Sequence, residues 1–144
     1  MLLYRQMSAQ RKVKYFLFCE HFSKDDTGRV SLNTIFDIVG DEKLPVVPPK
    51  FNIVFNVNIE DGDIRDGCVK FRIVLEDPQG KALVKVEALG EVAEAGNVVS
   101  NIPLDGKVPF SDKGQHIAKL FVNEKCVAKS SVEVVTGRPE DFKK

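Results

Sequence analysis

The densest cluster of potential metal ligands and nucleophiles lies in the segment FCEHFSKDDTGRV, Phe18 to Val30. Cys19, His21 and Asp25 carry a thiol, an imidazole and a carboxylate, the groups that bind zinc or form a nucleophile–base pair. In an extended strand Cys19 and His21 point to the same face. His116 is the only other histidine, so no second Cys/His pair completes a four-ligand zinc site. We therefore predict no metal ligands here, but a strand that leaves the core and turns in water.

Each of these groups also has a structural explanation. Asp25 belongs to the sequence DDTG, in which a short acidic side chain accepts hydrogen bonds from its own turn. His116 stands at the start of a strand and is expected to close one end of the core with one ring nitrogen hydrogen-bonded. We predict no catalytic residues and no cofactor. The alternative is a small metal-dependent or cysteine-based hydrolase that uses Cys19, His21, Asp25 and His116.

Two other kinds of site are not favoured. The segments GDEK and GDIRDG match neither of the glycine-rich phosphate-binding motifs. The segment EDGDIRDG, Glu60 to Gly67, carries carboxylates that could in principle serve glycoside hydrolysis, and these are Glu60, Asp61, Asp63 and Asp66. Exposed acidic loops are common, so we expect a polar hairpin loop.

The composition is that of an ordinary globular domain. Of the 144 residues, 43% are hydrophobic and 29% are charged, which suffices to bury a core without metal or disulfide staples. The 21 basic and 21 acidic residues give a formal net charge of +0, whereas proteins that bind nucleic acid usually carry a basic surplus. No stretch approaches the roughly 18 apolar residues of a membrane span. We therefore expect neither nucleic acid nor a membrane as partner.

The three cysteines, Cys19, Cys68 and Cys126, are widely spaced and form no CxxC pair. This indicates free thiols in a reducing compartment. Each lies in or beside an apolar run, so we expect all three to be at least partly buried. The run YFLFC is shorter than the roughly 7–15 apolar residues of a secretion signal, and we expect a cytoplasmic protein. Met1 and Met7 both qualify as the natural start.

Alternation of apolar and polar residues with a period of two dominates the sequence. The segments FNIVFNVNI (51–59), VKFRIVL (69–75) and VSLNTIFDI (30–38) each place apolar residues on one face, as a half-buried strand does. In the last segment the inward residues are expected to be Val30, Leu32, Phe36 and Ile38. YFLFC (15–19) is apolar on both faces, which predicts a central strand.

Turn residues separate these strands. The sequences DDTG (25–28), DPQG (77–80) and NEK (123–125) are predicted to close hairpins. The proline-punctuated stretches DEKLPVVPPK (41–50) and PLDGKVPFSDKG (103–114) are predicted to cross between sheets.

Seven to eight short strands with such turns indicate an all-β fold, an antiparallel β-sandwich of immunoglobulin-like or Greek-key type. We expect one domain over residues 13–135, preceded by an N-terminal extension over residues 1–12 and followed by a tail over residues 136–144.

Several short runs carry a resemblance to a known family. They are CE (19–20), GRVSL (28–32), IFD (35–37), LEDPQG (75–80), and PF (109–110) followed by GQH (114–116). Together they resemble an uncharacterised family of small bacterial and phage proteins, a "domain of unknown function". His116 departs from that family, which tends to show tyrosine there. The shared residues belong to turns and to the core, so the resemblance implies a β-sandwich and assigns no activity.

The polar sides of two strands form the candidate interaction face. If the strands over 51–59 and 69–75 pair through the acidic loop, their outward residues make one surface. These residues are Asn52, Val54, Asn56, Asn58, Lys70, Arg72 and Val74. A mixture of asparagine, arginine and aliphatic side chains suits a moderate protein–protein contact. We therefore predict a non-catalytic macromolecular interaction module that binds a protein partner or itself. A phage-derived structural or accessory protein is the alternative besides the hydrolase.

Overall fold

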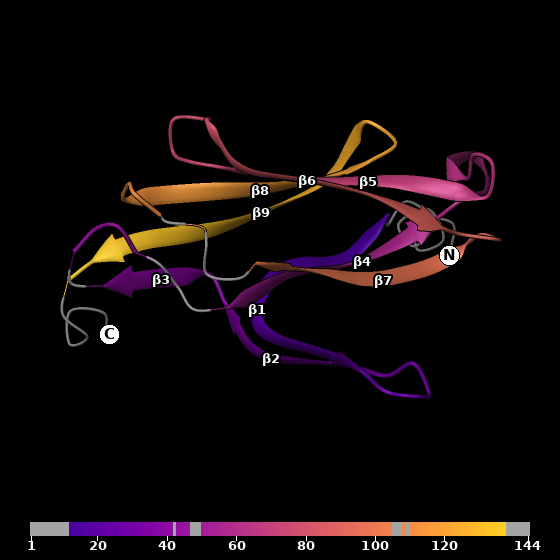
Figure 1. The fold of residues 1–144 in the computed structure, drawn as a ribbon, viewed down its shortest axis with the longest axis horizontal. Coiled ribbons are helices and arrows are strands. Elements are labelled where there is room, and N and C mark those ends of the chain that lie inside the picture. The colour runs from indigo at the N-terminus through magenta and orange to yellow at the C-terminus, as the bar shows by residue number, and fades with distance from the viewer. Residues whose placement is uncertain (1–11, 42, 47–49, 105–107, 109, 138–144) are drawn as a thin grey trace, which may run out of the picture.

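The protein is a sandwich of two β-sheets in the computed structural model, which describes residues 12–41, 43–46, 50–104, 108 and 110–137. Figure 1 shows the two layers. The four-stranded sheet has the order β2-β1-β4-β7, and its strands are β1 (Val13–Lys24), β2 (Val30–Phe36), β4 (Phe51–Ile59) and β7 (Gly96–Leu104). The five-stranded sheet has the order β3-β9-β8-β5-β6, and its strands are β3 (Ile38–Asp41), β5 (Cys68–Glu76), β6 (Ala82–Glu91), β8 (Gly114–Val122) and β9 (Lys125–Thr136).

The predicted fold class is confirmed. Strands that are neighbours in a sheet are often distant in sequence, since β1 lies beside β4 and β5 lies beside β8. This is the arrangement of an immunoglobulin-like, Greek-key sandwich. The predicted central position of YFLFC is also confirmed, because β1 pairs with β2 on one side and with β4 on the other.

The three predicted hairpins are present, and their turn residues explain them. The Asp25 carboxylate accepts hydrogen bonds from the backbone N–H groups of Thr27 (2.9 Å) and Arg29 (2.8 Å), which closes the β1–β2 turn. In the β5–β6 turn Asp77 binds two backbone N–H groups in the same way. Asn123 and Glu124 have φ angles of 47° and 74°, as a tight two-residue turn between β8 and β9 requires.

The core lies between the sheets and is rich in phenylalanine. Phe55 on β4 faces Phe71 on β5 with ring centroids 5.3 Å apart. His116 is fully buried at one end of this core. Its Nδ1 atom lies 3.1 Å from the carbonyl oxygen of Gly114, and its ring meets the ring of Phe110 edge-on at 4.9 Å. The prediction that His116 closes the core with one nitrogen hydrogen-bonded is thus confirmed.

The segment over residues 30–38 is not one strand, as the sequence suggested. The chain leaves the four-stranded sheet after Phe36, and β3 pairs in parallel with β9 in the other sheet. The Glu133 N–H donates to the carbonyl oxygen of Asp37 at 2.8 Å and fixes the switch. Ile38, predicted to point inward, is 56% exposed. The described residues therefore form nine strands with one parallel pair. Alternation reports which side of a strand is apolar, but not which sheet the strand joins.

The predicted pairing of the strands over 51–59 and 69–75 is wrong. These strands, β4 and β5, belong to opposite sheets. The acidic loop between them is a crossing rather than a hairpin, and it contains the short 3₁₀ turn η1 (Asp61–Asp63). Two strands that pair and two strands that face each other across a core both bury every second residue. Their alternation is therefore the same in the sequence.

The described strands share a single core, and β9 reaches Thr136, one residue beyond the predicted end of the domain. Residues 1–11 of the predicted extension, residues 138–144 of the predicted tail and the two candidate start residues lie outside the described residues. Over the part of the chain that the structure describes, no helix has the length and hydrophobicity that crossing a membrane requires.

Candidate functional site

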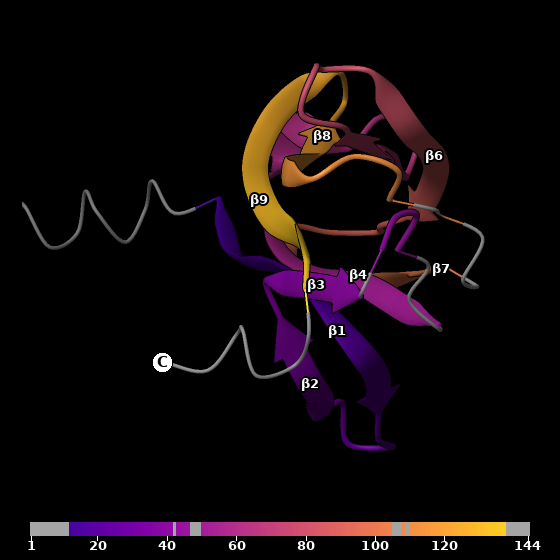
Figure 2. The ribbon, with the colours of Figure 1, turned by 90° about the vertical axis from the view of Figure 1, so that its left-hand side faces the viewer.

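The predicted interaction face is divided between the two sides of the sandwich. Asn52, Val54, Asn56 and Asn58 lie on the outer side of the four-stranded sheet, whereas Lys70, Arg72 and Val74 lie on the outer side of the five-stranded sheet. The prediction of one continuous surface from these residues is therefore wrong. The reason is the wrong pairing of β4 with β5. The end-on view of Figure 2 shows the two sheets with their outer sides facing apart. Each side is described in turn.

The outer side of the four-stranded sheet carries no formal charge at any of its paired positions. Its outward residues follow from the register of the strands. They are Tyr15, Leu17, Cys19, His21, Ser23, Ser31, Asn33, Ile35, Asn52, Val54, Asn56, Asn58, Asn97, Val99, Asn101 and Pro103. We call this surface the uncharged face. Lys14 lies in the bulge at the start of β1, outside the paired register.

The uncharged face has a buried floor and an exposed rim. Cys19 and Val54 are 0% exposed, whereas Ile35 on the edge strand β2 is 59% exposed. The Asn101 side-chain amide donates to the Asn52 side-chain oxygen at 2.8 Å, and the Asn52 amide donates to the carbonyl oxygen of Glu20 at 3.0 Å. The asparagines therefore hold one another in place across three strands.

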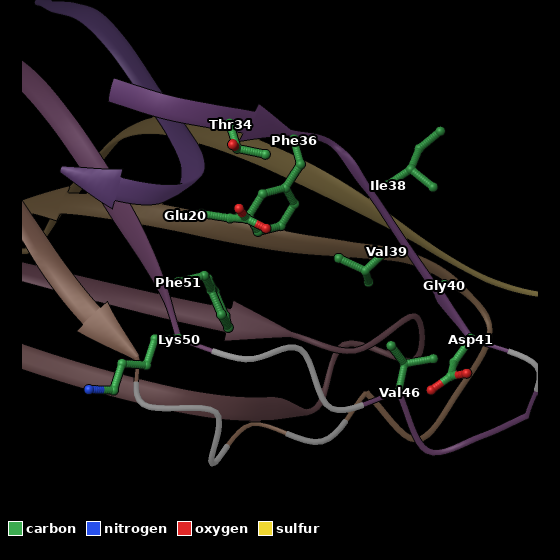
Figure 3. A pocket seen from close by; sticks show the side chains of 10 residues that line it. All are labelled: Glu20, Thr34, Phe36, Ile38, Val39, Gly40, Asp41, Val46, Lys50 and Phe51. Atoms are coloured by element: carbon green, nitrogen blue, oxygen red, sulfur yellow. The ribbon is translucent and has the colours of Figure 1, made fainter. Parts of the chain in front are cut away.

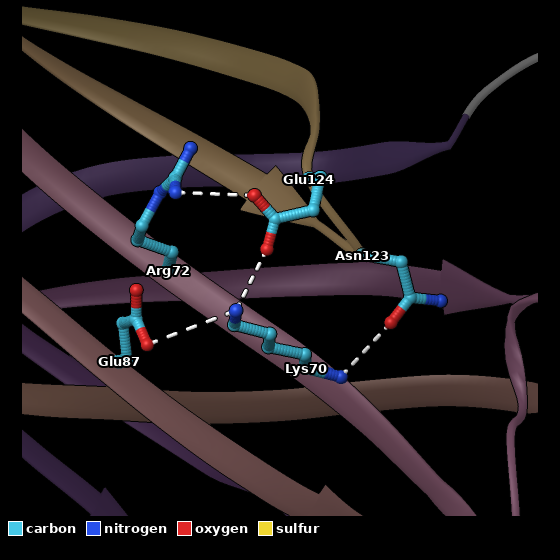
Figure 4. A network of polar contacts seen from close by, with 5 residues as sticks. All are labelled: Lys70, Arg72, Glu87, Asn123 and Glu124. Carbon is cyan, nitrogen blue, oxygen red and sulfur yellow. Dashed lines mark hydrogen bonds and ion pairs between the residues drawn. The ribbon is translucent and has the colours of Figure 1, made fainter.

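The outer side of the five-stranded sheet carries interlocked charges, and we call it the charged face. Its centre is a network of Lys70, Arg72, Glu87, Asn123 and Glu124, drawn in Figure 4. The Glu124 carboxylate accepts from Lys70 at 2.7 Å and from Arg72 at 3.2 Å. Glu87 lies 3.8 Å from the Lys70 ammonium. The Arg72 guanidinium also stands 4.3 Å from the centre of the Phe121 ring, an attractive cation–π contact.

These contacts alter the protonation of the charged face. The hydrogen bond from Lys70, followed by the attraction of Lys70 and Arg72, lowers the pKa of the Glu124 carboxyl below its ordinary value. The same hydrogen bond and the nearby carboxylates raise the pKa of Lys70. Both groups therefore stay ionised over a wide pH range. The charges of this network are therefore already paired with one another, although the buried Nε atom of Arg72 has no hydrogen-bond partner among the described residues.

The four residues of the hydrolase alternative are not brought together. Cys19 is buried and His21 is exposed on the uncharged face, while His116 lies in the core between the sheets. Asp25 is engaged in its own turn, where hydrogen bonds from the Thr27 hydroxyl and the Arg29 backbone lower its pKa. The described residues include no group of three or more His, Cys, Asp or Glu side chains that could hold a metal ion.

The cysteines differ in exposure. Cys19 is buried, Cys68 is half-buried and Cys126 is exposed, and all three are free thiols. The expectation that each is at least partly buried is wrong for Cys126, which follows the Asn123–Glu124 turn and lies opposite Phe121 on the outer side of its sheet. Burial raises the pKa of the Cys19 thiol. Its Sγ atom donates to the carbonyl oxygen of His21 at 3.4 Å.

The acidic loop uses a carboxylate to hold the fold. The Asp63 side chain accepts from the backbone N–H of Glu60 at 2.9 Å and pairs with the Lys12 ammonium. Burial alone would raise the pKa of Asp63, but the hydrogen bonds from Lys12 and Glu60 outweigh it and lower the pKa. This carboxylate fastens the crossing between the sheets to the start of β1.

A pocket that no sequence pattern signalled opens where the chain passes from β2 to β3 (Figure 3). Its volume is about 420 Å³, and its walls come from β1, β2, β3 and the residues around the start of β4. Because these segments are distant in sequence, their spacing carries no motif. The switch at Asp37, which could not be read from alternation, creates this opening.

Comparison with known proteins finds a matching family and several similar solved structures. No curated protein matches the chain. Among solved structures, an immunoglobulin-like protein from Pseudomonas aeruginosa is 16% identical with a TM-score of 0.40, over 86% of this chain and 95% of that one. The CARDB domain of a Pyrococcus furiosus protein, in complex with di-metal ions, is 14% identical with a TM-score of 0.44, over 86% and 92%.

An alkylpurine DNA glycosylase from Pseudomonas fluorescens, bound to DNA containing an abasic site analogue, is 9% identical with a TM-score of 0.43 over 85% of this chain. This chain spans only 30% of the length of that glycosylase. At these scores none of the three structures assigns a ligand or an activity to the present chain.

The sequence match is more extensive. The sequence model of a family described as "Family of unknown function (DUF6941)" covers residues 14–135, which is nearly the whole sandwich from β1 to β9. The resemblance to a domain of unknown function that the turn and core residues carry is confirmed, and the chain belongs to this family.

Proposed function

We propose that this protein is a non-catalytic interaction module that binds another protein through its uncharged face. One observation carries the proposal: four neighbouring strands present outward residues without a single Asp, Glu, Lys or Arg at the paired positions. Charged residues are depleted at the centres of protein interfaces, because burying a charge without a partner is costly. A sheet side that faces only water has no such restriction.

The composition of the uncharged face fits a contact of moderate strength. Apolar area comes from the exposed Ile35 and, in addition, from Tyr15, Leu17, Val99 and Pro103. The asparagines supply side chains that both donate and accept hydrogen bonds. Four strands spaced about 4.8 Å apart and about 30 Å long cover roughly 500–600 Å². This approaches the roughly 800 Å² per partner of a standard interface.

A second copy of the chain is the simplest partner with the required chemistry. A two-fold axis would place the uncharged face against itself, where no like charges oppose each other. The formal net charge of +0 adds no repulsion between whole molecules. The edge strand β7, which pairs only with β4 among the described strands and carries no charged residue, offers unpaired backbone groups at the border of the same face.

The remaining parts of the proposal concern catalysis and location. The burial of Cys19 and the position of His116 in the core, apart from Cys19 and His21, support a protein without hydrolase activity. Three free thiols support a reducing compartment, and we place the protein in the cytoplasm.

The test uses two matched variants. Ile35 on the uncharged face and Leu89 on the outer side of β6 are both large, exposed hydrophobic residues, 59% and 70% exposed. Ile35→Lys and Leu89→Lys therefore make the same chemical change on opposite sides of the sandwich. We expect Ile35→Lys to weaken association at least tenfold, measured by light scattering across a dilution series and by capture of partners from the native host. Leu89→Lys should behave as wild type.

The proposal would be contradicted by two results. In the first, both variants retain the same partners and the same mass as the wild type. In the second, Leu89→Lys alone loses them, which would place the contact on the charged face. The melting temperature of each variant must match that of the wild type within a few degrees, so that a loss of association is not a loss of folding.

A further inference from the structure

The pocket at the β2–β3 switch is independent of the uncharged face, because it opens at the end of the sandwich. Its volume of about 420 Å³ lies within the range of roughly 300–1,000 Å³ that small-ligand sites occupy. Figure 3 shows side chains from both sheets around it. The chain passes from the four-stranded to the five-stranded sheet at this point, and this leaves the space between the two layers open here.

The walls of the pocket are largely apolar and partly aromatic. Phe36 and Phe51 meet with ring centroids 5.9 Å apart and planes inclined at 73°. Val46 is buried and Val39 is half-buried, and both line the pocket from the side of the five-stranded sheet. Aromatic rings carry a negative face. Such a wall accepts an apolar body and attracts a positive group at its ring faces.

Glu20 is the unusual residue of this pocket. It follows the buried core residues Phe16 and Phe18 on the inward side of β1. Phe36 pairs with Phe18 in the β1–β2 register, so Glu20 and Phe36 are diagonal neighbours on adjacent strands, and both line the pocket (Figure 3). Within the described part of the chain, no hydrogen bond or ion pair reaches the carboxylate of this half-buried side chain. Because this carboxylate is without a partner beside aromatic residues of the lining, it can pair with a cation that enters the pocket.

The backbone next to Glu20 is strained. The β1–β2 register pairs Cys19 with Ile35 and His21 with Asn33, and Thr34 between them has a φ of 56°. For a β-branched residue this left-handed conformation is a genuine outlier. Strain of this kind persists where the surroundings enforce it, and it is frequent at ligand sites. The irregularity in β2 thus falls at the rim of the pocket, opposite Glu20.

The charges of the pocket favour a cation over an anion. Asp41, at the end of β3, adds a second carboxylate to the lining. Lys50 is the only basic side chain among the described lining residues. Figure 3 shows its ammonium pointing away from the Glu20 carboxylate. Asp41 has an interaction of its own, so Glu20 is the carboxylate of the described lining that can receive a cation, and the Lys50 ammonium is turned away from it.

We propose that this pocket binds a cation carried on an apolar body, as in an alkylammonium or arylalkylammonium group. The ammonium lies between the Glu20 carboxylate and the Phe36 ring, where a charge-assisted hydrogen bond and a cation–π contact act together. The apolar body covers Phe51, Val39 and Val46. A free amine and a lysine side chain of another protein both have this chemistry, and the test below separates them.

The experiment compares three probes of nearly equal shape: phenethylammonium, the neutral phenethyl alcohol and the anionic phenylacetate. Each is titrated into the full chain, and binding is followed by calorimetry and by backbone amide NMR shifts. We expect phenethylammonium to bind at least tenfold more tightly than the alcohol, and phenylacetate not to bind. The shifted amides should include Thr34, Val39 and Gly40. Glu20→Gln should reduce the affinity for phenethylammonium at least tenfold and leave that for the alcohol unchanged.

Matched controls and a second pair of probes complete the test. Glu124→Gln removes an exposed carboxylate on the charged face and should leave the affinity unchanged, and Lys50→Ala should not weaken it. Tighter binding of Nα-acetyl-lysine methylamide than of phenethylammonium would identify a lysine side chain as the occupant. Tighter binding of phenethylammonium would identify a small-molecule amine. Equal binding of cation and alcohol, unchanged binding by Glu20→Gln, or shifts confined to other regions would overturn the proposal. If Glu20→Gln does not fold, the comparison of the three probes on the wild-type protein tests the proposal.

Discussion

The two outer sides of the sandwich have the same strand geometry but different chemistry. On the charged face Arg72 stands between Glu87 on β6 and Phe121 on β8. On the uncharged face Val54 stands between Leu17 on β1 and Asn101 on β7. Both arrangements leave the inner faces free to pack the core. The fold therefore constrains the inner residues, while the outer residues reflect what each side contacts.

Solvation alone explains the charged face. Exposed ion pairs contribute little to stability, because water screens them and long side chains lose freedom. They do keep a sheet side soluble and discourage unwanted contacts. The uncharged face lacks this protection around its exposed Ile35. The proposed contact with another protein surface would account for that difference, and the following predictions test how far the two faces differ.

The largest expected effect is on stability when a charge is placed at the centre of each face. Val54 and Val74 are both nearly buried, 0% and 8% exposed. Val54→Asp would bury a carboxylate among uncharged neighbours, and we expect it to lower the free energy of unfolding by roughly 3–5 kcal/mol. Val74→Asp would lie between Lys85 and Lys119, and we expect a loss of about 1–3 kcal/mol. Urea unfolding measures both, and equal losses would show that the two faces do not differ in polarity.

A smaller effect is expected when a polar contact is removed from each face. Arg72→Ala removes the bond to Glu124 and the contact with Phe121, and should cost about 1 kcal/mol. Asn101→Ala removes a neutral hydrogen bond to Asn52 and should cost a similar amount, about 1 kcal/mol. The two losses should respond differently to salt. The Arg72 contribution should shrink in 1 M sodium chloride because salt screens charges, whereas a decrease in the Asn101 contribution would contradict its assignment as a neutral contact.

The pH dependence of stability should also distinguish the faces. The pKa of Glu124 is lowered in the folded protein by the hydrogen bond from Lys70, then by the attraction of Lys70 and Arg72. Its contribution is therefore present above the ordinary glutamate pKa of about 4.3 and is lost as the pH falls through the lower, folded pKa. The melting temperatures of wild type and Glu124→Gln should differ slightly at neutral pH and converge in acid. A difference that persists unchanged as the pH falls far below the ordinary glutamate pKa would contradict the ionic origin of the contribution.

Thiol reactivity should differ between the faces without any change in stability. Cys126 is exposed beside the charged face, whereas Cys19 is buried in the uncharged face and burial raises its thiol pKa. Since the thiolate is the reactive form, a small thiol reagent should label Cys126 quickly and Cys19 only after unfolding. Mass spectrometry of the labelled peptides measures this. Rapid native labelling of Cys19 would show that the floor of the uncharged face is open to solvent.

Much of the sandwich was predictable because its signals are local. The turn DPQG is specified by four adjacent residues, and the Asp77 side chain accepts hydrogen bonds from the backbone N–H groups of the turn that it begins. The inward residues of β5 follow from alternation, and Phe71, Ile73 and Leu75 are all buried. The burial of His116 followed from its place at the start of a strand.

The features that were not predictable depend on where strands meet in space. Alternation is the same whether β4 pairs with β5 or faces it, so the division of the predicted interaction face could not be foreseen. The switch after Phe36 depends on a hydrogen bond from distant Glu133. The pocket follows from this switch and combines Glu20 with Val46, two residues without any sequence relation. Glu20, directly after the buried Phe16 and Phe18 on the inward side of β1, was the signal that could have indicated it.

The most direct test of the uncharged face as the contact surface is photo-crosslinking in the native host. Benzoylphenylalanine replaces Ile35 in one variant and Leu89 in the other, so that the same reactive group stands on opposite sides of the sandwich. The position-35 variant should yield a crosslinked product, whose mass shows whether the partner is a second copy or another protein, and the position-89 variant should yield none. A product from position 89 with none from position 35 would contradict the central claim.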